Sequence, residues 1–223
     1  GLERHIRPYR NGRDLTQQPR GVKVIDLYGM EAGEVREKYP AVYQHVKEEV
    51  KPQRDAKAGS SKDADRYAER WWLFGKTRPT MRDALDGLDR YIATPETAKH
   101  RFFQFLDIEI LPDNMVTALA LEDAFHLGVL SSSIHVTWSL AAGGTLEDRP
   151  RYTKTQCFDP FPFPVATESQ KTTIRDLGER LDAHRKERLG EHDDLTMTAL
   201  YNVLKKEQSG EELDEQEREI HKK

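Results

Sequence analysis

The sequence predicts an α+β fold, in which a mixed sheet-and-helix domain is followed by a C-terminal helical appendage. Two observations predict it. Short β-branched and aromatic stretches alternate with helical patterns as far as a proline-rich segment at residues 158–164, and the residues after this segment show helical periodicity only. We therefore expect an α+β domain over residues 1–164 and a helical region over residues 165–223. The helical pattern still runs at the last residue, so we expect the chain to be part of a longer protein.

The α+β domain is predicted to begin with a strand at residues 22–28, which are rich in β-branched side chains. Helical patterns follow at residues 31–38 and 41–51, and Pro52 is expected to end the second helix. Residues 54–65 are polar and without a strong period, which predicts an exposed loop or a frayed helix start.

The middle of the domain is predicted to contain most of its strands. A short helix at residues 80–88 precedes a strand at residues 91–94. Residues 102–111 and 115–121 are apolar-rich and are separated by the turn signal Pro-Asp-Asn at residues 112–114. This arrangement predicts a hairpin.

The longest apolar-periodic stretch predicts a single helix at residues 123–142, ended by two glycines. Its buried side is expected to include Phe125, Val129, Ile134 and Trp138. A polar loop is expected at residues 145–155. Alternating prolines then make residues 158–164 a rigid extended segment, which cannot be a regular helix or a central strand.

The C-terminal region predicts three helices, at residues 168–189, 196–206 and 211–223. In the first of them, Ile174, Leu177 and Leu181 form one apolar stripe, which we expect to be the buried face.

Composition narrows the class of protein. The chain has 223 residues, 36% hydrophobic and 33% charged, and a formal net charge of -4. Residues 165–223 hold 11 Lys and Arg against 15 Asp and Glu, while residues 1–164 hold 24 of each sign. Nucleic-acid-binding domains are usually basic, so the net charge argues weakly against DNA without excluding it.

Several classes of protein are disfavoured. No apolar run approaches the ~18 residues of a membrane span, and the N-terminus lacks the apolar core of a signal peptide, so we expect a cytoplasmic protein with no membrane partner. Cys157 is the only cysteine, which excludes an internal disulfide and a paired-thiolate metal site.

The sequence contains no specific catalytic signature. It has no nucleophile elbow, zinc-protease, phosphate-loop or dinucleotide-binding motif, and its eight histidines are scattered without metal-ligand spacing. We therefore expect no catalytic residue, no metal and no cofactor in this chain.

Basic and aromatic residues gather near the predicted turns, where recognition residues usually lie. They are Arg78, Arg82 and Arg90, then Lys99, His100 and Arg101, and finally Arg149, Arg151, Tyr152 and Lys154. Arg and Lys neutralise phosphates, and Arg also binds guanine bidentately. On composition alone, ordinary surface charges are the better explanation of these residues, because 33% of the chain is charged.

An ordered series of sequence blocks carries a resemblance to a known family. The blocks are Tyr9-Arg10-Asn11-Gly12-Arg13-Asp14, Val24-Ile25-Asp26-Leu27-Tyr28-Gly29, Val50-Lys51-Pro52-Gln53-Arg54-Asp55, Trp71-Trp72, Arg78-Pro79, Arg90-Tyr91-Ile92-Ala93-Thr94-Pro95 with Lys99-His100-Arg101, Gly128-Val129-Leu130-Ser131-Ser132 with His135 and Trp138, and Arg151-Tyr152-Thr153-Lys154-Thr155-Gln156-Cys157-Phe158 with Pro160-Phe161-Pro162-Phe163-Pro164. Together they resemble the C-terminal portion of the MmeI-like (type IIL) single-chain restriction-modification enzymes and their methyltransferase relatives, over residues 6–164.

The resemblance implies that this chain is a target-recognition domain, with double-stranded DNA as its partner. In that family, an S-adenosylmethionine-binding methyltransferase domain lies upstream and acts on an adenine amino group through an Asn-Pro-Pro-aromatic motif, which is absent here. Catalysis and cofactor binding would therefore belong to the parent chain, a restriction-modification methyltransferase of bacterial defence. Whether the parent also carries a nuclease stays open.

The resemblance also implies a pair of specificity residues before the Arg-Tyr motif, which would be Glu147 and Arg149 here. Opposite charges two positions apart in an extended loop point the same way and can address one base pair together. Arg149 would donate to guanine O6 and N7, and Glu147 would accept from cytosine N4 or orient the arginine, which predicts a G·C pair in the recognised site. Asn114 is a second candidate base-reading residue, placed by approximate spacing.

The DNA backbone is expected to contact the following residues: Lys99, His100, Arg101, Arg151 and Lys154. For Arg151 and Tyr152, a role in holding the loop against the domain is an equal alternative.

Two other functions stay open. The aromatic block and the helical tail can dock a partner protein instead of DNA, and a small stand-alone enzyme would need a pocket with convergent titratable groups. A concave basic surface joining Lys99, Arg101, Arg149 and Lys154 would favour DNA.

Overall fold

The computed structural model describes residues 1–147 and 149–221. The chain divides into two compact units. The first consists of Gly1–Pro8 and Lys23–Ala84, and the second consists of Tyr9–Val22 and Leu85–Lys223. Within the described residues, no helix has both the length and the apolar character needed to cross a membrane.

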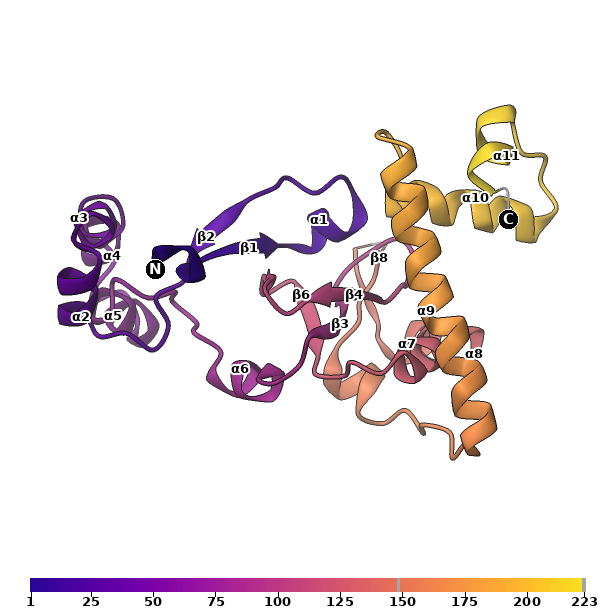
Figure 1. Ribbon diagram of the computed structural model, residues 1–223, viewed down its shortest axis with the longest axis horizontal. Helices are drawn as coiled ribbons and strands as arrows, with labels where there is room; N and C mark the ends of the chain where they lie inside the picture. The colour runs from indigo at the N-terminus through magenta and orange to yellow at the C-terminus, as the bar shows by residue number, and fades with distance from the viewer. Residues whose placement is uncertain (148, 222–223) are drawn as a thin grey trace. The chain divides into compact units, whose positions relative to one another are not determined.

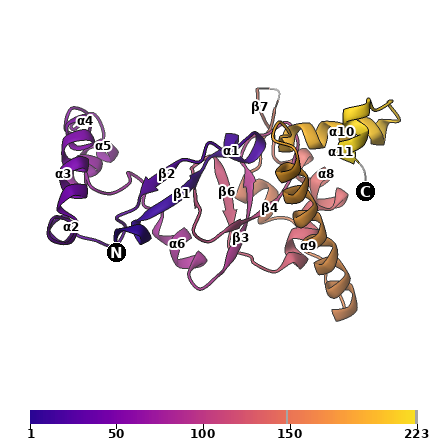
Figure 2. The same ribbon diagram turned by 45° about the horizontal axis from the view of Figure 1, so that its top comes forward.

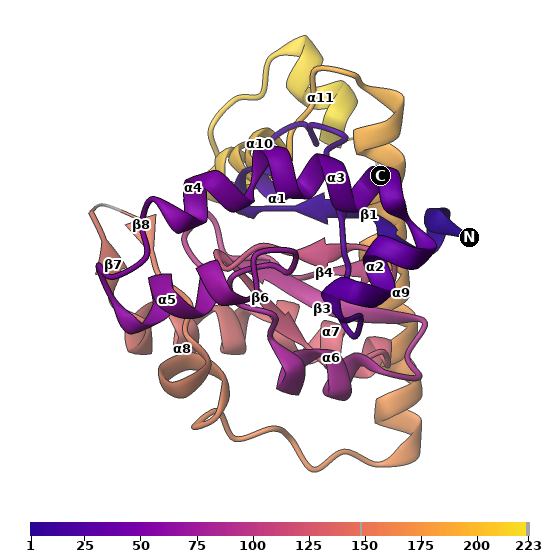
Figure 3. The ribbon, with the colours of Figure 1, turned by 90° about the vertical axis from the view of Figure 1, so that its left-hand side faces the viewer.

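The first unit combines a two-stranded ribbon with short helices, and Figure 3 shows the helices from the front. In the ribbon, residues 6–8 of β1 (Ile6–Arg10) pair antiparallel with β2 (Lys23–Ile25). The helical elements are η1 (Leu2–His5), α2 (Ala32–Lys38), α3 (Pro40–Glu49), α4 (Lys51–Asp55), α5 (Lys62–Glu69) and α6 (Pro79–Leu85).

Helices α2 and α3 of the first unit pack around a small apolar core of Leu27, Met30, Val35 and Leu73. The indole N–H of Trp72 donates to the Met30 carbonyl at 2.8 Å, so the aromatic block anchors the chain that follows α5. Pro52 does not end the helical region as expected. It lies in the first turn of α4, where a missing N–H leaves no intrahelical hydrogen bond unmade.

The polar stretch after α4 contains a helix, α5, where the sequence predicts a loop or a frayed helix start. The hydroxyl of Ser61 accepts a hydrogen bond from the Ala64 N–H at 3.1 Å and satisfies one of the unpaired donors of the first turn. Two acidic residues in that turn, Asp63 and Asp65, also favour the positive end of the helix.

The sheet of the second unit has β3 (Arg90–Pro95) at its centre (Figure 2). Strands β4 (Gln104–Asp107) and β6 (Val116–Leu119) pair antiparallel with its two edges. The predicted hairpin between the two apolar stretches is therefore wrong, because β3 lies between them. The intervening β5 (Leu111–Pro112) instead pairs parallel with the second half of β1, at Tyr9 and Arg10.

Two helices occupy the stretch where the sequence predicts one. They are α7 (Ala124–Ser131) and α8 (Ser133–Ala142). The break falls at Ser132, whose side chain accepts from the His135 N–H at 3.3 Å and begins the second helix. The break also turns Ile134 outward, where it is 74% exposed, contrary to its predicted burial.

The stretch expected to be a polar loop holds a short hairpin and a turn of π-helix. Strands β7 (Thr145–Leu146) and β8 (Arg149–Pro150) pair antiparallel, and the π-helical turn spans Lys154–Phe158. The phenylalanines of the proline-rich segment pack inward: Phe161 and Phe163 contact each other with ring centroids 5.3 Å apart, and Phe161 lies 4.3 Å from the His135 ring.

The C-terminal helices are α9 (Glu168–Glu191), α10 (Met197–Ser209) and α11 (Glu215–His221). Helix α9 runs beside α7 (Figure 1). The two helices approach closely at Gly178, where a Cβ atom would lie 2.3 Å from the Ala124 carbonyl oxygen. The predicted apolar stripe is wrong in part, because Leu177 is 53% exposed.

The buried face of α9 is polar and binds the edge of the sheet. Asp182 accepts a hydrogen bond from the Phe105 N–H at 3.0 Å, and Arg185 donates to the Phe103 carbonyl at 2.7 Å. These side chains satisfy backbone groups that an edge strand otherwise leaves unpaired. The α+β class with C-terminal helices is confirmed, and α9 belongs to the same compact unit as the sheet rather than to a separate region that begins at residue 165.

Candidate nucleic-acid interface

A surface hollow in the second unit gathers residues from four separate segments. We call it the hairpin hollow, and its volume is about 740 Å³. It is lined by Asn11, Gly12, Arg13, Thr16, Gln17, Thr97, Asp113, Asn114, Met115, Leu146 and Arg149. Two of the three predicted base-reading residues, Asn114 and Arg149, therefore line one hollow, although 35 positions separate them in the sequence.

The first wall of the hairpin hollow is helix α1 (Gly12–Thr16), which begins with a capping box. The Asn11 side chain accepts from the Asp14 N–H at 3.0 Å, and the Asp14 carboxylate accepts from the Asn11 N–H at 2.9 Å. Arg20 also binds this carboxylate through Nε and Nη2, each at 2.8 Å. The hydrogen bond from Arg20 holds the pKa of the buried Asp14 well below its usual range, so α1 is fixed in place at neutral pH.

The second wall is the turn before β6. The Asp113 carboxylate accepts from the Tyr9 hydroxyl at 2.6 Å and from the Met115 N–H at 2.7 Å. Burial, together with this hydrogen bond, raises the pKa of Tyr9 to about 12. With its amide oriented to satisfy its neighbours, the exposed Asn114 donates to the same carboxylate at 2.9 Å. The turn thus presents an asparagine whose orientation is set by Asp113.

The third wall is the β7–β8 hairpin, which carries the predicted specificity pair. Arg149 donates to the Glu147 carboxylate at 2.6 Å, and both side chains are exposed, by 49% and 71%. The two charges are adjacent as predicted, but for a different reason. Glu147 has a positive φ of 56° in the hairpin turn, so the turn, and not an extended loop, brings the side chains together.

The base of the hairpin is held by Arg101, which is only 4% exposed. Its guanidinium donates to the Pro95 carbonyl at 2.5 Å, to the Thr94 hydroxyl at 2.8 Å and to the Pro150 carbonyl at 3.1 Å. Burial lowers the pKa of Arg101 to about 10, so the group stays charged at neutral pH. This placement contradicts the predicted phosphate contact of Arg101, because its donors are directed at carbonyl groups inside the unit.

Tyr152 is completely buried and continues the support under the hairpin. Its ring centroid lies 5.1 Å from the Arg101 guanidinium carbon, and its hydroxyl oxygen lies 3.1 Å from Nε2 of the buried His135. Burial lowers the pKa of His135 to about 4, so this histidine is neutral at pH 7. Of the two alternatives for Tyr152, the structure supports holding the loop.

Two predicted phosphate contacts are exposed but engaged in ion pairs. Arg151 donates to the Glu96 carboxylate at 2.6 Å, and Lys154 donates to the Asp159 carboxylate at 2.7 Å. Such surface pairs contribute little stability and exchange readily for a phosphate.

Lys99 and His100 meet a C-terminal helix. Both contact the Asn202 side-chain oxygen on α10 at 2.8 Å, and the His100 ring stacks on Tyr201 with centroids 5.9 Å apart. Burial lowers the pKa of His100. Arg101 therefore cannot contribute to a concave basic surface with Lys99, Arg149 and Lys154, because it is interior, and each of the other three has a polar partner.

The hairpin hollow also contains polar residues that were not singled out from the sequence, notably Asn11, Arg13 and Thr97. The spacing of Asn11 and Asp14 signals a helix start. It does not indicate that this helix lies in the fold beside Asp113 and Asn114, which are far away in the sequence. Arg13 and Arg149 provide donors and Asp113 provides acceptors, and Glu147 lies beside the hollow, bound to Arg149. This mixed chemistry fits the polar edges of bases better than a row of phosphates.

Metal chemistry has no visible site in residues 1–147 and 149–221, since no group of three or more His, Cys, Asp or Glu side chains lies in a position to hold an ion.

The chain has relatives among known proteins, both by sequence and by fold. The chain is 24% identical over 147 residues to DNA methyltransferase A of Bacillus subtilis (strain 168), which covers 64% of this chain and 15% of that protein. It is similar to the solved structure of the type IIL restriction-modification enzyme MmeI in complex with DNA, with a TM-score of 0.72 and 21% identity over 98% of this chain and 30% of that one. The chain thus spans less than a third of each of these relatives.

A family model decides the assignment. The model of the MmeI target recognition domain matches residues 3–165, which is well over half of the chain and contains every wall of the hairpin hollow. The chain therefore belongs to the MmeI target recognition domain family.

Proposed function

We propose that this chain binds double-stranded DNA in a sequence-specific manner and acts as the target-recognition module of a longer DNA methyltransferase. The observation that carries the proposal is the hairpin hollow, which brings Asn114, Arg149 and Arg13 together from three segments. Exposed amide and guanidinium groups on short turns, backed by a hydrogen-bonded interior, are the usual means of reading base edges in a groove.

The Glu147–Arg149 pair reads a G·C base pair in this proposal. Arg149 donates to guanine O6 and N7, and the contact at 2.6 Å supports an orienting role for Glu147. Asn114 is suited to adenine, because a side-chain amide can both accept from N6 and donate to N7.

Backbone phosphates are proposed to bind Lys99, His100, Arg151 and Lys154 at the margin of this interface. Each of them already has a polar partner in the second unit, so DNA binding would exchange those contacts for phosphate contacts. Such exchange makes these contacts strongly dependent on salt.

The chemistry of the proposed parent lies outside this chain. We propose that an upstream domain of the same protein, which is also the partner of this module, binds S-adenosylmethionine and methylates an adenine amino group. The recognition module would hold the duplex while the target base turns out of the helix into that domain. The 24% identity to a DNA methyltransferase supports this assignment.

Binding by the 223-residue chain tests the first part of the proposal. Fluorescence anisotropy with labelled duplexes measures binding by the chain. Selection of bound duplexes from a randomised pool, followed by sequencing of the bound fraction, should return a site with at least one fixed G·C pair. A bound fraction with no enriched sequence, or no binding in low salt, would overturn the proposal.

Methylation tests the second part. Mapping of methylated bases in DNA from cells that express the full-length protein should show N6-methyladenine inside the same enriched site. Methylation of cytosine, or at an unrelated site, would contradict the assignment.

A further inference from the structure

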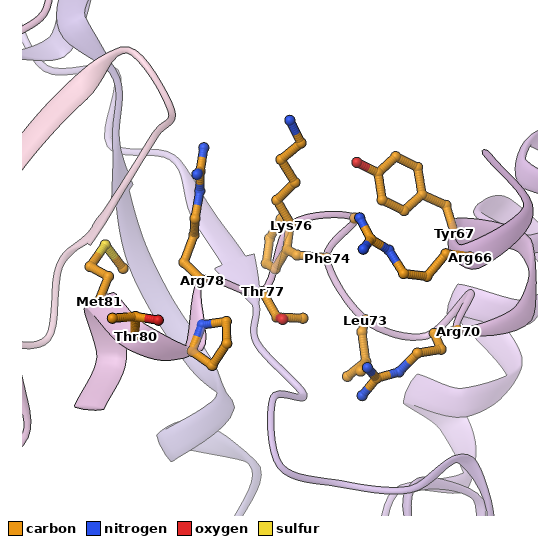
Figure 4. A pocket seen from close by; sticks show the side chains of 12 residues that line it. Arg66, Tyr67, Arg70, Leu73, Phe74, Lys76, Thr77, Arg78, Thr80 and Met81 are labelled. Carbon is orange, nitrogen blue, oxygen red and sulfur yellow. The ribbon is translucent and has the colours of Figure 1, made fainter. Parts of the chain in front are cut away.

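A second hollow lies in the first unit, and several of the side chains that line it are basic. Its volume is about 560 Å³, and we call it the basic hollow. The side chains that matter are those of Arg66, Tyr67, Arg70, Phe74, Lys76 and Arg78 (Figure 4). Residues 66–82 carry five Lys or Arg and a single carboxylate, Glu69, in a chain whose net charge is -4.

The two walls of the basic hollow are anchored independently. On one side, Arg54 donates to the Tyr67 and Arg70 carbonyls, each at 3.3 Å, and fixes the end of α5. On the other side, Arg82 binds both oxygens of the buried Asp26 at 2.7 and 3.1 Å and also donates to the Thr77 carbonyl at 2.8 Å. The loop between these anchors is therefore held at a fixed place on the surface of the unit.

The cations of the loop are directed away from this framework. Lys76 and Arg78 are exposed and extend in the same direction from the loop (Figure 4). Among the described residues, neither side chain has an ion pair or a hydrogen bond, whereas other cations on helices of the first unit do, such as Lys38 with Glu34 and Lys51 with Asp55.

The backbone at Arg78 is strained. Its φ is 54°, in the left-handed region that non-glycine residues seldom adopt, and it precedes Pro79, which restricts it further. Strain of this kind persists where the surrounding structure fixes it. Here the Arg82 anchor fixes it, and the result is that Arg78 projects over the hollow beside Lys76.

We infer that the basic hollow binds a backbone phosphate of double-stranded DNA, as a contact that is independent of base sequence. The inference rests on the proposed function, which concerns the second unit, and adds a contact in the first. Uncompensated Lys and Arg side chains on a fixed loop are the groups that neutralise phosphates and release counterions. A phosphate fits them better than a base edge, because Lys76 has no fixed donor geometry.

The test compares two double variants of the 223-residue chain. K76Q/R78Q removes the two cations of the basic hollow, and R36Q/K47Q removes one Arg and one Lys that are exposed in the same unit but do not line the hollow. Anisotropy is measured with two duplexes, one containing the enriched site and one of unrelated sequence, between about 50 and 200 mM salt.

K76Q/R78Q should weaken binding to both duplexes by roughly tenfold or more and reduce the slope of log K against log salt by about 2. R36Q/K47Q should keep the wild-type slope, and the charge-preserving K76R/R78K should restore it. An unchanged salt slope in K76Q/R78Q, or an equal loss of slope in R36Q/K47Q, overturns this inference. In either case, binding by the wild-type chain leaves the proposed function standing. Absence of binding by the wild-type chain instead overturns the proposed function, and this inference falls with it.

Thermal unfolding should give equal midpoints for wild type and K76Q/R78Q, because neither side chain packs in the core.

Discussion

The guanidinium of Arg101 donates to the carbonyl of Pro150 at 3.1 Å, across 49 positions of sequence. The same guanidinium also donates to the Pro95 carbonyl at the end of β3, so Arg101 joins that strand to the strand that carries Arg149. The interior of the second unit therefore sets the position of the hairpin, and four predictions for stability and recognition follow from the groups around it.

Replacement of Arg101 by Ala should destabilise the chain by about 3 kcal/mol. The change leaves the buried Pro95 carbonyl without this donor, which costs about 1–3 kcal/mol, and it leaves the Pro150 carbonyl with only the longer hydrogen bond from the Ala98 N–H at 3.4 Å. Arg101→Lys should recover only part of the loss, because one ammonium cannot reach both carbonyls with the geometry of the guanidinium. Urea unfolding measures both values. A loss below about 1 kcal/mol for the alanine variant would contradict the interior role.

Stability should fall between pH 6.5 and pH 4 because of His135. Its pKa is lowered by burial to about 4, whereas the unfolded chain has a value near 6.5, so the unfolded state binds the proton first as the pH falls. The contribution is fully present above pH 6.5 and decreases by about 3 kcal/mol on the way to pH 4.

Urea unfolding of wild type and His135→Phe at several pH values checks this expectation. The variant loses the contact with the Tyr152 hydroxyl and is less stable at pH 7, but its stability should depend less on pH across this window. Parallel pH profiles for the two proteins would show that His135 is not the titrating group.

Gly143 should tolerate no side chain. A Cβ at this position would lie 2.1 Å from the Arg151 carbonyl oxygen and 2.8 Å from the Cys157 sulfur, so Gly143→Ala must push the hairpin away from α8. We expect a loss of about 2–4 kcal/mol. The matched change Gly190→Ala, in α9 where no atom lies within 4 Å of the added carbon, should be neutral or stabilise by up to about 1 kcal/mol. Similar midpoints in thermal unfolding for the two variants would refute the close packing.

Substitutions of Glu147 and Arg149 should change the preference for one base pair to different extents. Arg149→Ala should cost about 1–3 kcal/mol on the preferred duplex and relax the preference at one base pair. Glu147→Gln keeps the side-chain length but weakens the orienting contact at 2.6 Å, so it should relax the same position by less. Sequencing of DNA bound by each variant gives both results. Relaxation at different base pairs would show that the residues do not act together.

Much of the fold follows from periodicity, but the pairing of the strands does not. The sequence correctly indicates apolar segments around β4, β6 and β3, and a hairpin between the first two is the simplest connection. The structure instead places β3 between them, where it is buried along nearly its whole length, as a central strand is. Local patterns carry no information about which of three strands takes that place.

The candidate site shows the same limit. Resemblance located Glu147, Arg149 and Asn114, and the spacing of two opposite charges indicated their contact. Arg101 was misplaced because an arginine next to Lys99 and His100 has the composition of a surface patch, and its burial depends on carbonyls brought in from β3 and β8. The contribution of α1 to the hairpin hollow could not be predicted, since it depends on the parallel pairing of Tyr9 with Leu111.

The left-handed backbone at Glu147 restricts which residues can exchange at the tip of the hairpin. Asn, Asp and Gly adopt this conformation readily, whereas Val, Ile and Thr do so only with strain. The left-handed backbone therefore limits which side chains can occupy this position, whatever base they would contact. Arg149, in ordinary strand geometry, has no such limit. A library that varies residue 149 freely but residue 147 only among residues tolerant of positive φ would therefore retain more folded members than one that varies both without restriction.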